Sequence, residues 1–278
     1  MTEIVAHHGL FKNTNLHVDD TGGTGRPVVL IHGWPLSGEA FKNQVPALQA
    51  AGYRVITYDR RGFGRSDKPM TGYTYDTLTE DLQALLEELD LRDVTLVGFS
   101  MGGGEVARYF SKYSPERIRS VVFASAVPPF MMQGEDNPDG PLTKDAAAGM
   151  TKDLTKDEES FYDGFTTDFF SANGELKVTE GQRQEALDLC RQADKKAALA
   201  CMEAFGTTDF RDDLLKVTVP ALVLHGDADA TVPFEGSGQR THATLAGSDL
   251  HVIKDGPHGC NVSHPDEWNQ ALITFLAK

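Results

Sequence analysis

Short apolar runs alternate with helical patterns along the first half of the chain. Four runs rich in β-branched residues end near Gly, Asp or Pro, at residues 28–31, 54–58, 94–97 and 120–123. Continuous apolar runs of this length are typical of strands that helices cover on both faces. The pattern therefore predicts a mainly parallel sheet flanked by helices, which is an α/β fold.

One helix stands out between the second and third runs. Its apolar positions recur at spacings of three and four, which is typical of a helix with one buried face; they are Leu78, Leu82, Leu85, Leu86 and Leu89. Thr77, with Glu80 three residues later, predicts a capping box at its start.

The strand pattern stops near residue 127 and resumes near residue 216. Pro128 and Pro129 open this region, and a loop rich in Gly and Pro follows at 134–141. Helical patterns then cover about 157–170 and 182–205. Later the chain shows strands at 221–224 and 251–253 and a closing helix at 265–276. We expect one α/β core, formed by residues 1–127 and 216–278, with a helical cap inserted at residues 128–215.

Composition and charge narrow the function classes. The chain has 278 residues, which is near the upper limit for one hydrophobic core. Its formal net charge of −15 disfavours a nucleic-acid partner, because phosphate binding relies on clustered basic residues. No segment approaches the roughly 20 consecutive apolar residues that a membrane helix needs. Residues 1–8 show no secretory signal pattern, so we expect a soluble, cytoplasmic protein.

The strongest candidate chemistry belongs to one serine. Ser100 lies in Gly98-Phe-Ser-Met-Gly102, directly after the predicted strand 94–97 and before a helical pattern. This is the context that the G-x-S-x-G nucleophile elbow requires. Glycines on both sides remove side chains that would collide in so sharp a turn. The placement favours a nucleophile over a surface serine in a Gly-rich turn.

A serine hydroxyl needs a general base, and the base needs a group that orients it. Asp229 lies in a G-x-x-D loop after the strand 221–224, and His258 lies in the loop after the strand 251–253. Both side chains can therefore reach the top of the sheet, where Ser100 is expected. Asp227 is the competing acid, and we expect it to cap the turn instead.

Acyl transfer also requires hydrogen-bond donors for the oxyanion. One candidate is the backbone N–H of Met101, and the other is that of Trp34 in the loop His32-Gly-Trp-Pro35. Pro35 has no N–H, but it restricts Trp34 to extended backbone angles and so fixes the direction of the Trp34 carbonyl. Alternatively, this loop is only a turn and Trp34 only a packing residue.

Four motifs together resemble the α/β-hydrolase superfamily and, within it, the cofactor-free (non-haem) bacterial haloperoxidases and aryl esterases. They are His32-Gly-Trp-Pro35, Tyr58-Asp-Arg-Arg-Gly-Phe-Gly-Arg-Ser66, Gly98-Phe-Ser-Met-Gly-Gly-Gly-Glu105 and Pro257-His-Gly259. The resemblance implies the α/β-hydrolase fold, with Ser100 as nucleophile, Asp229 as acid and His258 as base, in the chain order that this fold uses. It also implies an oxyanion hole formed by Trp34 and Met101, and a structural role for residues 59–66.

The resemblance further implies an activity. Members of this family hydrolyse small carboxylic esters, and many exchange water for hydrogen peroxide, releasing a peracid that oxidises halide without metal or haem. We therefore expect a small ester or acyl substrate, hydrogen peroxide as a co-substrate and no cofactor. In this family the residue after the oxyanion tryptophan, here Pro35, affects the choice between water and peroxide. Related enzymes often form homo-oligomers, which leaves a homo-oligomer open for this chain.

Aromatic side chains mark the cap as a candidate pocket lining. Phe161, Phe165 and Phe169 recur every four residues, and Phe130 follows the proline pair. We expect Phe130, Pro35, Phe161 and Phe165 to contact the substrate, with Phe130 the strongest candidate. Such a lining favours a small aromatic or aliphatic acyl group. Alternatively, the stripe only packs the cap onto the core.

The same residues are compatible with some other functions and argue against others. Lactonase or lactamase activity would use the same three residues. A non-catalytic ligand receptor on a hydrolase fold is the alternative from another class. Dehalogenases and epoxide hydrolases use an aspartate as the elbow nucleophile, so Ser100 argues against both. The nine histidines show no metal-ligand spacing, and three cysteines are too few for a disulfide framework, so no metal is expected.

Overall fold

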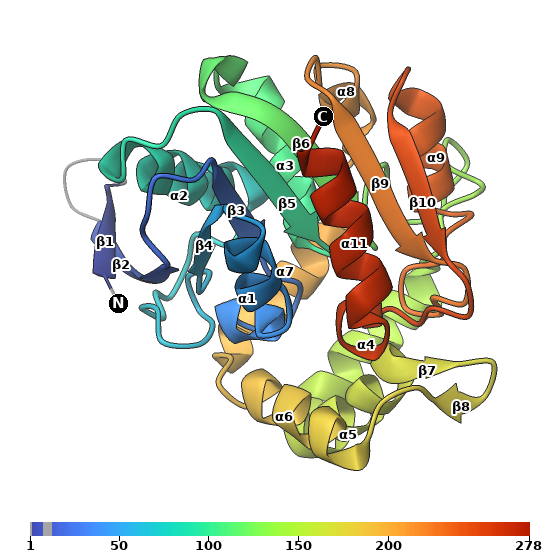
Figure 1. The fold of residues 1–278 in the computed structure, drawn as a ribbon. Helices are drawn as coiled ribbons and strands as arrows, with labels where there is room; N and C mark the ends of the chain where they lie inside the picture. The colour runs from blue at the N-terminus through green and yellow to red at the C-terminus, as the bar shows by residue number, and fades with distance from the viewer. Residues whose placement is uncertain (1, 8–12) are drawn as a thin grey trace.

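The computed structural model describes residues 2–7 and 13–278. Its main sheet has eight strands in the order β1-β2-β4-β3-β5-β6-β9-β10 (Figure 1). The strands are β1 (Thr2–His7), β2 (Asn13–Asp20), β3 (Pro27–Ile31), β4 (Arg54–Tyr58), β5 (Val94–Phe99), β6 (Ile118–Ala124), β9 (Ala221–Gly226) and β10 (Asp249–Ile253). The pairs β1–β2 and β2–β4 are antiparallel and the other pairs are parallel. The predicted, mainly parallel sheet is confirmed.

The two antiparallel strands were not predicted, because they lack a continuous apolar run. In β2 the buried residues Leu16 and Val18 alternate with more exposed positions. Such alternation is typical of an antiparallel strand with only one covered face. The central strand β5, by contrast, is buried at all six positions, as its apolar run requires.

Helices cover both faces of the sheet. Figure 1 shows α1 (Gln44–Ala50) and α11 (Pro265–Leu276) in front of it, with α2 (Tyr75–Glu88) and α3 (Gly102–Lys112) behind. The shorter helices of the core are η2 (Gly38–Phe41), η3 (Pro115–Arg117), α9 (Gly238–Thr244) and α10 (Cys260–Ser263). No helix in the described part of the chain is long and apolar enough to cross a membrane.

The predicted start of α2 is wrong by one turn. The helix begins at Tyr75, and the side chain of Thr74 caps it by accepting a hydrogen bond from the N–H of Thr77 (3.4 Å). Thr77 therefore lies inside the first turn, where its N–H is one of the donors that need a cap. Thr74 and Thr77 both suit a cap, so residue type alone did not decide between them.

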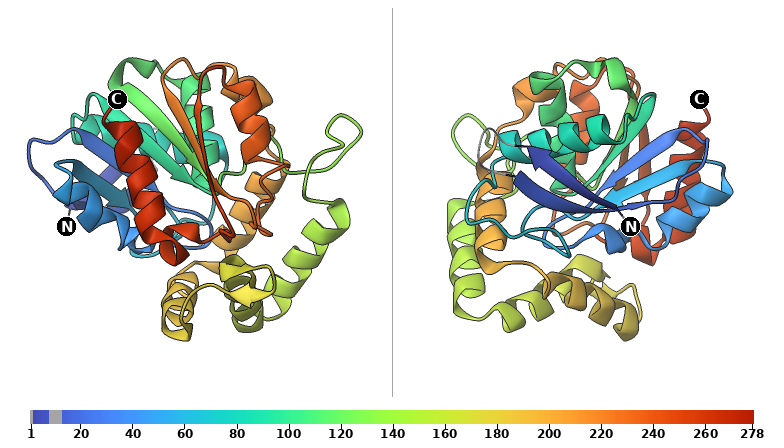
Figure 2. Two further views of the ribbon diagram at one scale, coloured as in Figure 1. Left: turned by 45° about the vertical axis from the view of Figure 1, so that its right-hand side comes forward. Right: turned by 90° about the vertical axis from the view of Figure 1, so that its left-hand side faces the viewer.

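Between β6 and β9 the chain forms a mostly helical segment, most of which lies beyond the carboxyl ends of the strands (Figures 1 and 2). Its elements are α4 (Lys144–Lys156), α5 (Glu158–Phe170), β7 (Ser171–Ala172), β8 (Glu175–Leu176), α6 (Glu180–Cys190), α7 (Lys195–Thr207) and α8 (Arg211–Leu214). We keep the name cap for residues 128–215, whose boundaries stay a prediction. Within this range α8 lies against the core, where Asp213 Oδ2 accepts a hydrogen bond from Arg108 Nε of α3 (2.9 Å).

The helical pattern at 182–205 corresponds to two helices, α6 and α7. Asp194 separates them because its carboxylate caps α7, accepting a hydrogen bond from the N–H of Ala197 (3.0 Å). The N–H of Asp194 also donates to the carbonyl of Gly62 in the core (2.8 Å). The break between the helices is thus a point where the cap is attached to the core.

The buried central strand allows a test of the core. We expect Leu96→Ala in β5 to lower the free energy of unfolding by about 2–5 kcal/mol, because it leaves a cavity between covered faces. Urea denaturation would measure the change. As a control, Leu176→Ala at an exposed cap position should change it by less than about 0.5 kcal/mol. Equal effects would contradict the placement of β5 at the centre.

Candidate active site

Ser100 occupies a sharp turn between β5 and α3. Its φ is +54°, in the left-handed region that side chains rarely adopt. A Cβ atom on Gly98 would lie 2.6 Å from the carbonyl oxygen of Gly102, and one on Gly102 would lie 2.4 Å from that of Ile31. Only glycine fits at either position. Gly98 and Gly102 therefore permit the sharp turn that directs Ser100 away from the sheet.

His258 lies between Ser100 and Asp229. Its Nε2 is 2.9 Å from Ser100 Oγ, and its Nδ1 is 2.7 Å from Asp229 Oδ2. All three side chains are buried. They come from the loops after β5, β9 and β10, whose carboxyl ends meet at one edge of the sheet. With the Nδ1 proton donated to the carboxylate, Nε2 is free to accept the proton of the serine hydroxyl.

Asp229 is held as a carboxylate. Its Oδ1 accepts hydrogen bonds from the N–H groups of Thr231 (3.0 Å) and Val232 (2.7 Å). Burial alone would raise the pKa of Asp229, but the neighbouring His258 and His225 lower it to about 2. The competing acid, Asp227, instead accepts a hydrogen bond from the N–H of Asp255 at its Oδ1 (2.6 Å). Only one of the two aspartates therefore reaches His258.

Two backbone N–H groups beside Ser100 are held in fixed directions. The carbonyl of Gly33 accepts hydrogen bonds from Leu36 N (3.1 Å) and His32 Nδ1 (2.8 Å), and that of Ser100 accepts them from Gly103 N (3.0 Å) and Val127 N (3.2 Å). A planar trans peptide points its N–H opposite to its C=O. Those bonds therefore orient the N–H groups of Trp34 and Met101, which donate to no acceptor in the described residues.

A buried ionic network lies behind the Trp34 loop. The N–H of Arg60 donates to His32 Nε2 (2.9 Å), which assigns the histidine proton to Nδ1. The Arg60 guanidinium donates to the carbonyl of His32 (2.7 Å) and, through Nε, to Glu105 Oε1 of α3 (2.7 Å). Burial and the charge of Arg60 hold the pKa of His32 well below its usual range. Three of the sequence motifs contain these residues, but they did not show that the residues contact one another, because they lie up to 73 positions apart.

Ser100 and His258 open into a cavity of about 60 Å³. Its other lining residues are mostly apolar: Trp34, Val127, Met131, Leu142, Met150, Phe165, Phe205, Thr231 and Val232. Five of these also line an outer cavity of about 590 Å³, to which Phe161 contributes. The two cavities are thus adjacent, with Phe165 among the residues that line both and Phe161 in the outer one only.

The structure places Phe130 outside both cavities, contrary to our expectation. Its ring faces Arg211, whose Cζ lies 5.4 Å from the ring centroid. Its neighbour Met131 lines both cavities instead. Pro35 also lies outside the lining of both cavities; its peptide bond to Trp34 is cis.

The Trp34 side chain joins the core to the cap. Its indole Nε1 donates to the carbonyl of Ala198 in α7 (2.9 Å). The rings of Phe161, Phe165 and Phe205 surround it, with centroids 5.3–6.1 Å away. The Trp34 side chain therefore packs the cap onto the core, which is the role that the sequence left open as an alternative to a backbone donor.

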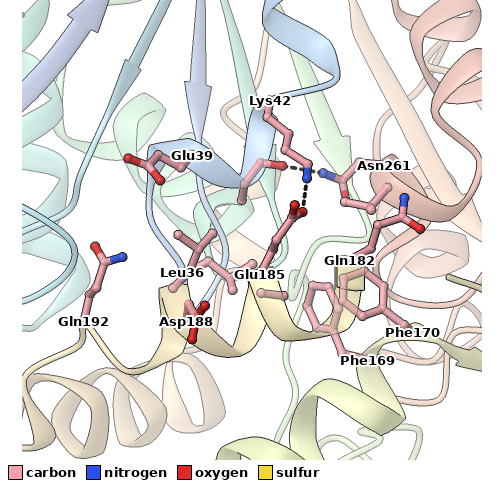
Figure 3. A pocket seen from close by; sticks show the side chains of 14 residues that line it. Leu36, Glu39, Lys42, Phe169, Phe170, Gln182, Glu185, Asp188, Gln192 and Asn261 are labelled. Carbon is pink, nitrogen blue, oxygen red and sulfur yellow. Dashed lines mark hydrogen bonds and ion pairs between the residues drawn. The ribbon is translucent and has the colours of Figure 1, made fainter. Parts of the chain in front are cut away.

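A third cavity, of about 360 Å³, lies between η2 and α6 (Figure 3). An ion pair between Lys42 and Glu185 connects the two elements there. Phe169 lines this cavity and packs its ring edge-on against His258, with centroids 4.9 Å apart. Phe169 separates this third cavity from His258, and neither Ser100 nor His258 lines it. The candidate active site is therefore the smaller cavity of about 60 Å³, which both residues line.

Other reactive groups do not compete with Ser100. Among the residues that the structure describes, no three His, Cys, Asp or Glu side chains are grouped so that they could hold a metal ion. The three cysteines are free and buried. Burial raises the pKa of the Cys260 thiol to about 12, so it stays protonated at neutral pH.

Comparison with known proteins agrees with this geometry. A family model described as the alpha/beta hydrolase fold matches residues 26–265. The chain belongs to the α/β-hydrolase family.

Relatives within this family are similar over nearly the whole chain. A non-heme chloroperoxidase of Kitasatospora aureofaciens is 41% identical, covering 92% of this chain and 94% of its own. A bifunctional esterase/perhydrolase of Acinetobacter calcoaceticus is 36% identical, with coverages of 92% and 94%. The crystal structure of a bromoperoxidase from Bacillus anthracis is 50% identical, with a TM-score of 0.95 over 100% of both chains. The resemblance inferred from the four motifs is confirmed.

The buried ionic network in this hydrolase leads to a stability prediction. We expect Glu105→Gln to lower the free energy of unfolding by about 3–5 kcal/mol, because it leaves the buried Arg60 without its counter-charge. Urea denaturation would measure the change. The exposed Glu116→Gln, made as a control, should change it by less than about 0.5 kcal/mol. Unchanged stability in Glu105→Gln would contradict a structural role for the pair.

Proposed function

We propose that this protein is a serine hydrolase that cleaves small carboxylic esters and also uses hydrogen peroxide as an acyl acceptor. The observation that carries the proposal is the hydrogen-bonded series Ser100–His258–Asp229, with distances of 2.9 and 2.7 Å, at the wall of an apolar cavity. The names of the chloroperoxidase and esterase/perhydrolase relatives support both activities.

The first half of the proposed reaction forms an acyl-enzyme. Ser100 Oγ attacks the ester carbonyl carbon while His258 Nε2 takes the hydroxyl proton. Asp229 stabilises the resulting imidazolium without taking its proton. The N–H groups of Trp34 and Met101 donate to the oxyanion, and His258 then gives its proton to the departing alkoxide.

The second half transfers the acyl group to water or peroxide. His258 removes a proton from the incoming H₂O or H₂O₂, whose oxygen attacks the acyl carbon. The bond from that carbon to Ser100 Oγ then breaks, and the proton returns to the serine. Water yields a carboxylic acid and peroxide a peracid, which oxidises halide to hypohalous acid while being reduced to the carboxylic acid.

The sizes of the two cavities indicate which part of an ester each could hold. The space of about 60 Å³ beside Ser100 and His258 suits a small acyl group, and the outer space of about 590 Å³ suits a larger leaving group. Lactone or lactam opening would use the same groups. The receptor alternative loses support, because a binding protein has no need of an oriented general base. A cytoplasmic location and homo-oligomer formation stay predictions.

The assigned roles predict which single changes abolish hydrolysis. We expect Ser100→Ala and His258→Ala to lower kcat for phenyl acetate by at least about a thousandfold, because the nucleophile or its base is lost. A serine-directed inhibitor should label wild type at Ser100, as mass spectrometry would show. Asp229→Asn should also lose activity, whereas Asp227→Asn is the matched control that retains it. Unchanged turnover in Ser100→Ala, or a label elsewhere, would overturn the assignment.

A change at Pro35 tests the choice between water and peroxide. Proline limits Trp34 to extended angles, which directs the Trp34 carbonyl so that it can accept a hydrogen bond from peroxide. We expect Pro35→Leu to form less peracetic acid from acetate and hydrogen peroxide while still hydrolysing phenyl acetate. Both rates would be measured on the same preparations. Equal peracid formation in the two proteins would contradict the role given to Pro35.

A further inference from the structure

A second histidine contacts the proposed catalytic aspartate. His225, the fifth residue of β9, is fully buried. Its Nε2 lies 2.8 Å from the carbonyl oxygen of Val232 and 3.3 Å from Asp229 Oδ2. That carboxylate oxygen is the one that accepts the hydrogen bond from His258. Two imidazoles therefore converge on one oxygen atom.

The surroundings of His225 determine where its proton lies. Nε2 faces two oxygen acceptors, so an unprotonated Nε2 would set its lone pair against both. Nδ1 is buried and has no hydrogen-bond partner in the described part of the chain. The first residue of α9 closes over it, since a Cβ on Gly238 would lie 2.5 Å from Nδ1. A proton on Nδ1 would have no acceptor, which assigns the single proton to Nε2.

We propose that His225 is a positioning residue of the active site, whose Nε2–H holds Asp229 Oδ2 in place for His258. It touches neither substrate nor reacting atoms, and the inference rests on the function proposed above. Three N–H groups donate hydrogen bonds to the Asp229 carboxylate, two from the backbone at Oδ1 and that of His258 at Oδ2. The Nε2–H of His225, whose shorter contact is with the carbonyl of Val232 (2.8 Å), approaches Oδ2 to 3.3 Å and adds a weaker, fourth contact.

This arrangement affects the proton chemistry of His258. Asp229 is the charged group that faces His225, with His258 beyond it and the Cys260 thiol near the same carboxylate. α9 contributes Gly238, and the ring of Phe234 covers His225 with centroids 5.5 Å apart. A donor that shares Oδ2 draws negative charge away from the bond to His258. Without it, Asp229 would bind the protonated form of His258 more tightly.

The test uses the labelling of Ser100 by phenylmethanesulfonyl fluoride, measured as a rate against pH. We expect His225→Phe, which keeps a ring but has no N–H, to lower the maximal rate about tenfold. The acid limb of the profile should move to higher pH by about half a unit, because the protonated base is better stabilised. His225→Gln should restore the wild-type profile, since its amide nitrogen can occupy the place of Nε2.

Two further variants keep the inference falsifiable. His225→Asn carries its amide nitrogen near the position of Nδ1, so it should behave like His225→Phe; the Gln and Asn pair decides the matter if the Phe variant does not fold. His251→Phe, at a histidine with an exposed side chain, is the matched control and should leave the profile unchanged.

The outcomes separate this inference from the proposed function. Failure of wild-type Ser100 to be labelled would overturn the function itself. Normal labelling of Ser100, with lower thermal stability but an unmoved acid limb in His225→Phe and His225→Asn, would overturn only the role of His225.

Discussion

The active site depends on one constrained turn, in which Ser100 adopts a left-handed backbone between β5 and α3. β3, β5 and α3 approach so closely at this turn that a Cβ atom at position 98 or 102 would collide with the backbone. The turn therefore requires Gly98 and Gly102. The same close approach brings the Trp34 loop beside Ser100: a Cβ on Gly33 would lie 3.0 Å from Ser100 Cβ. Backbone packing thus arranges both the proposed nucleophile and the proposed oxyanion donors, so that these groups need to move little during the reaction.

Buried charges hold the groups around this turn. The Arg60–Glu105 pair connects the loop after β4 to α3 and, through His32, to the peptide that carries the Trp34 N–H. Asp229 is a second buried charge: three N–H groups donate to it, and His225 Nε2 lies 3.3 Å from its Oδ2. Burying charge is unfavourable unless partners compensate it. Both sites are fully surrounded by partners, so each combines a cost in stability with a rigid orientation of the groups beside Ser100.

The cap and the core meet at Trp34. Its backbone belongs to the proposed oxyanion hole, while its indole is bonded to α7 and enclosed by rings of α5 and α7. Any shift of the cap would therefore also displace the peptide of the proposed oxyanion hole. Phe169 extends this coupling, because its ring rests on His258 from the other side. The aromatic stripe of α5 therefore has both of the roles that the sequence left as alternatives: Phe165 lines the cavity, and Phe169 packs the cap onto Phe99 of the core.

The sequence by itself determined the strands of the parallel sheet, the inserted helical segment and the set Ser100, Asp229 and His258. Apolar runs, glycine spacing and the order of motifs along the chain can all be recognised without the tertiary structure. It did not determine which residue after Pro129 faces the cavity, and in the structure Met131 lines it whereas Phe130 does not. It also concealed the contacts of His32 with Arg60 and of His225 with Asp229. Those contacts arise only when strands distant in sequence become neighbours, since a buried polar atom takes its partner from whatever the tertiary structure places beside it.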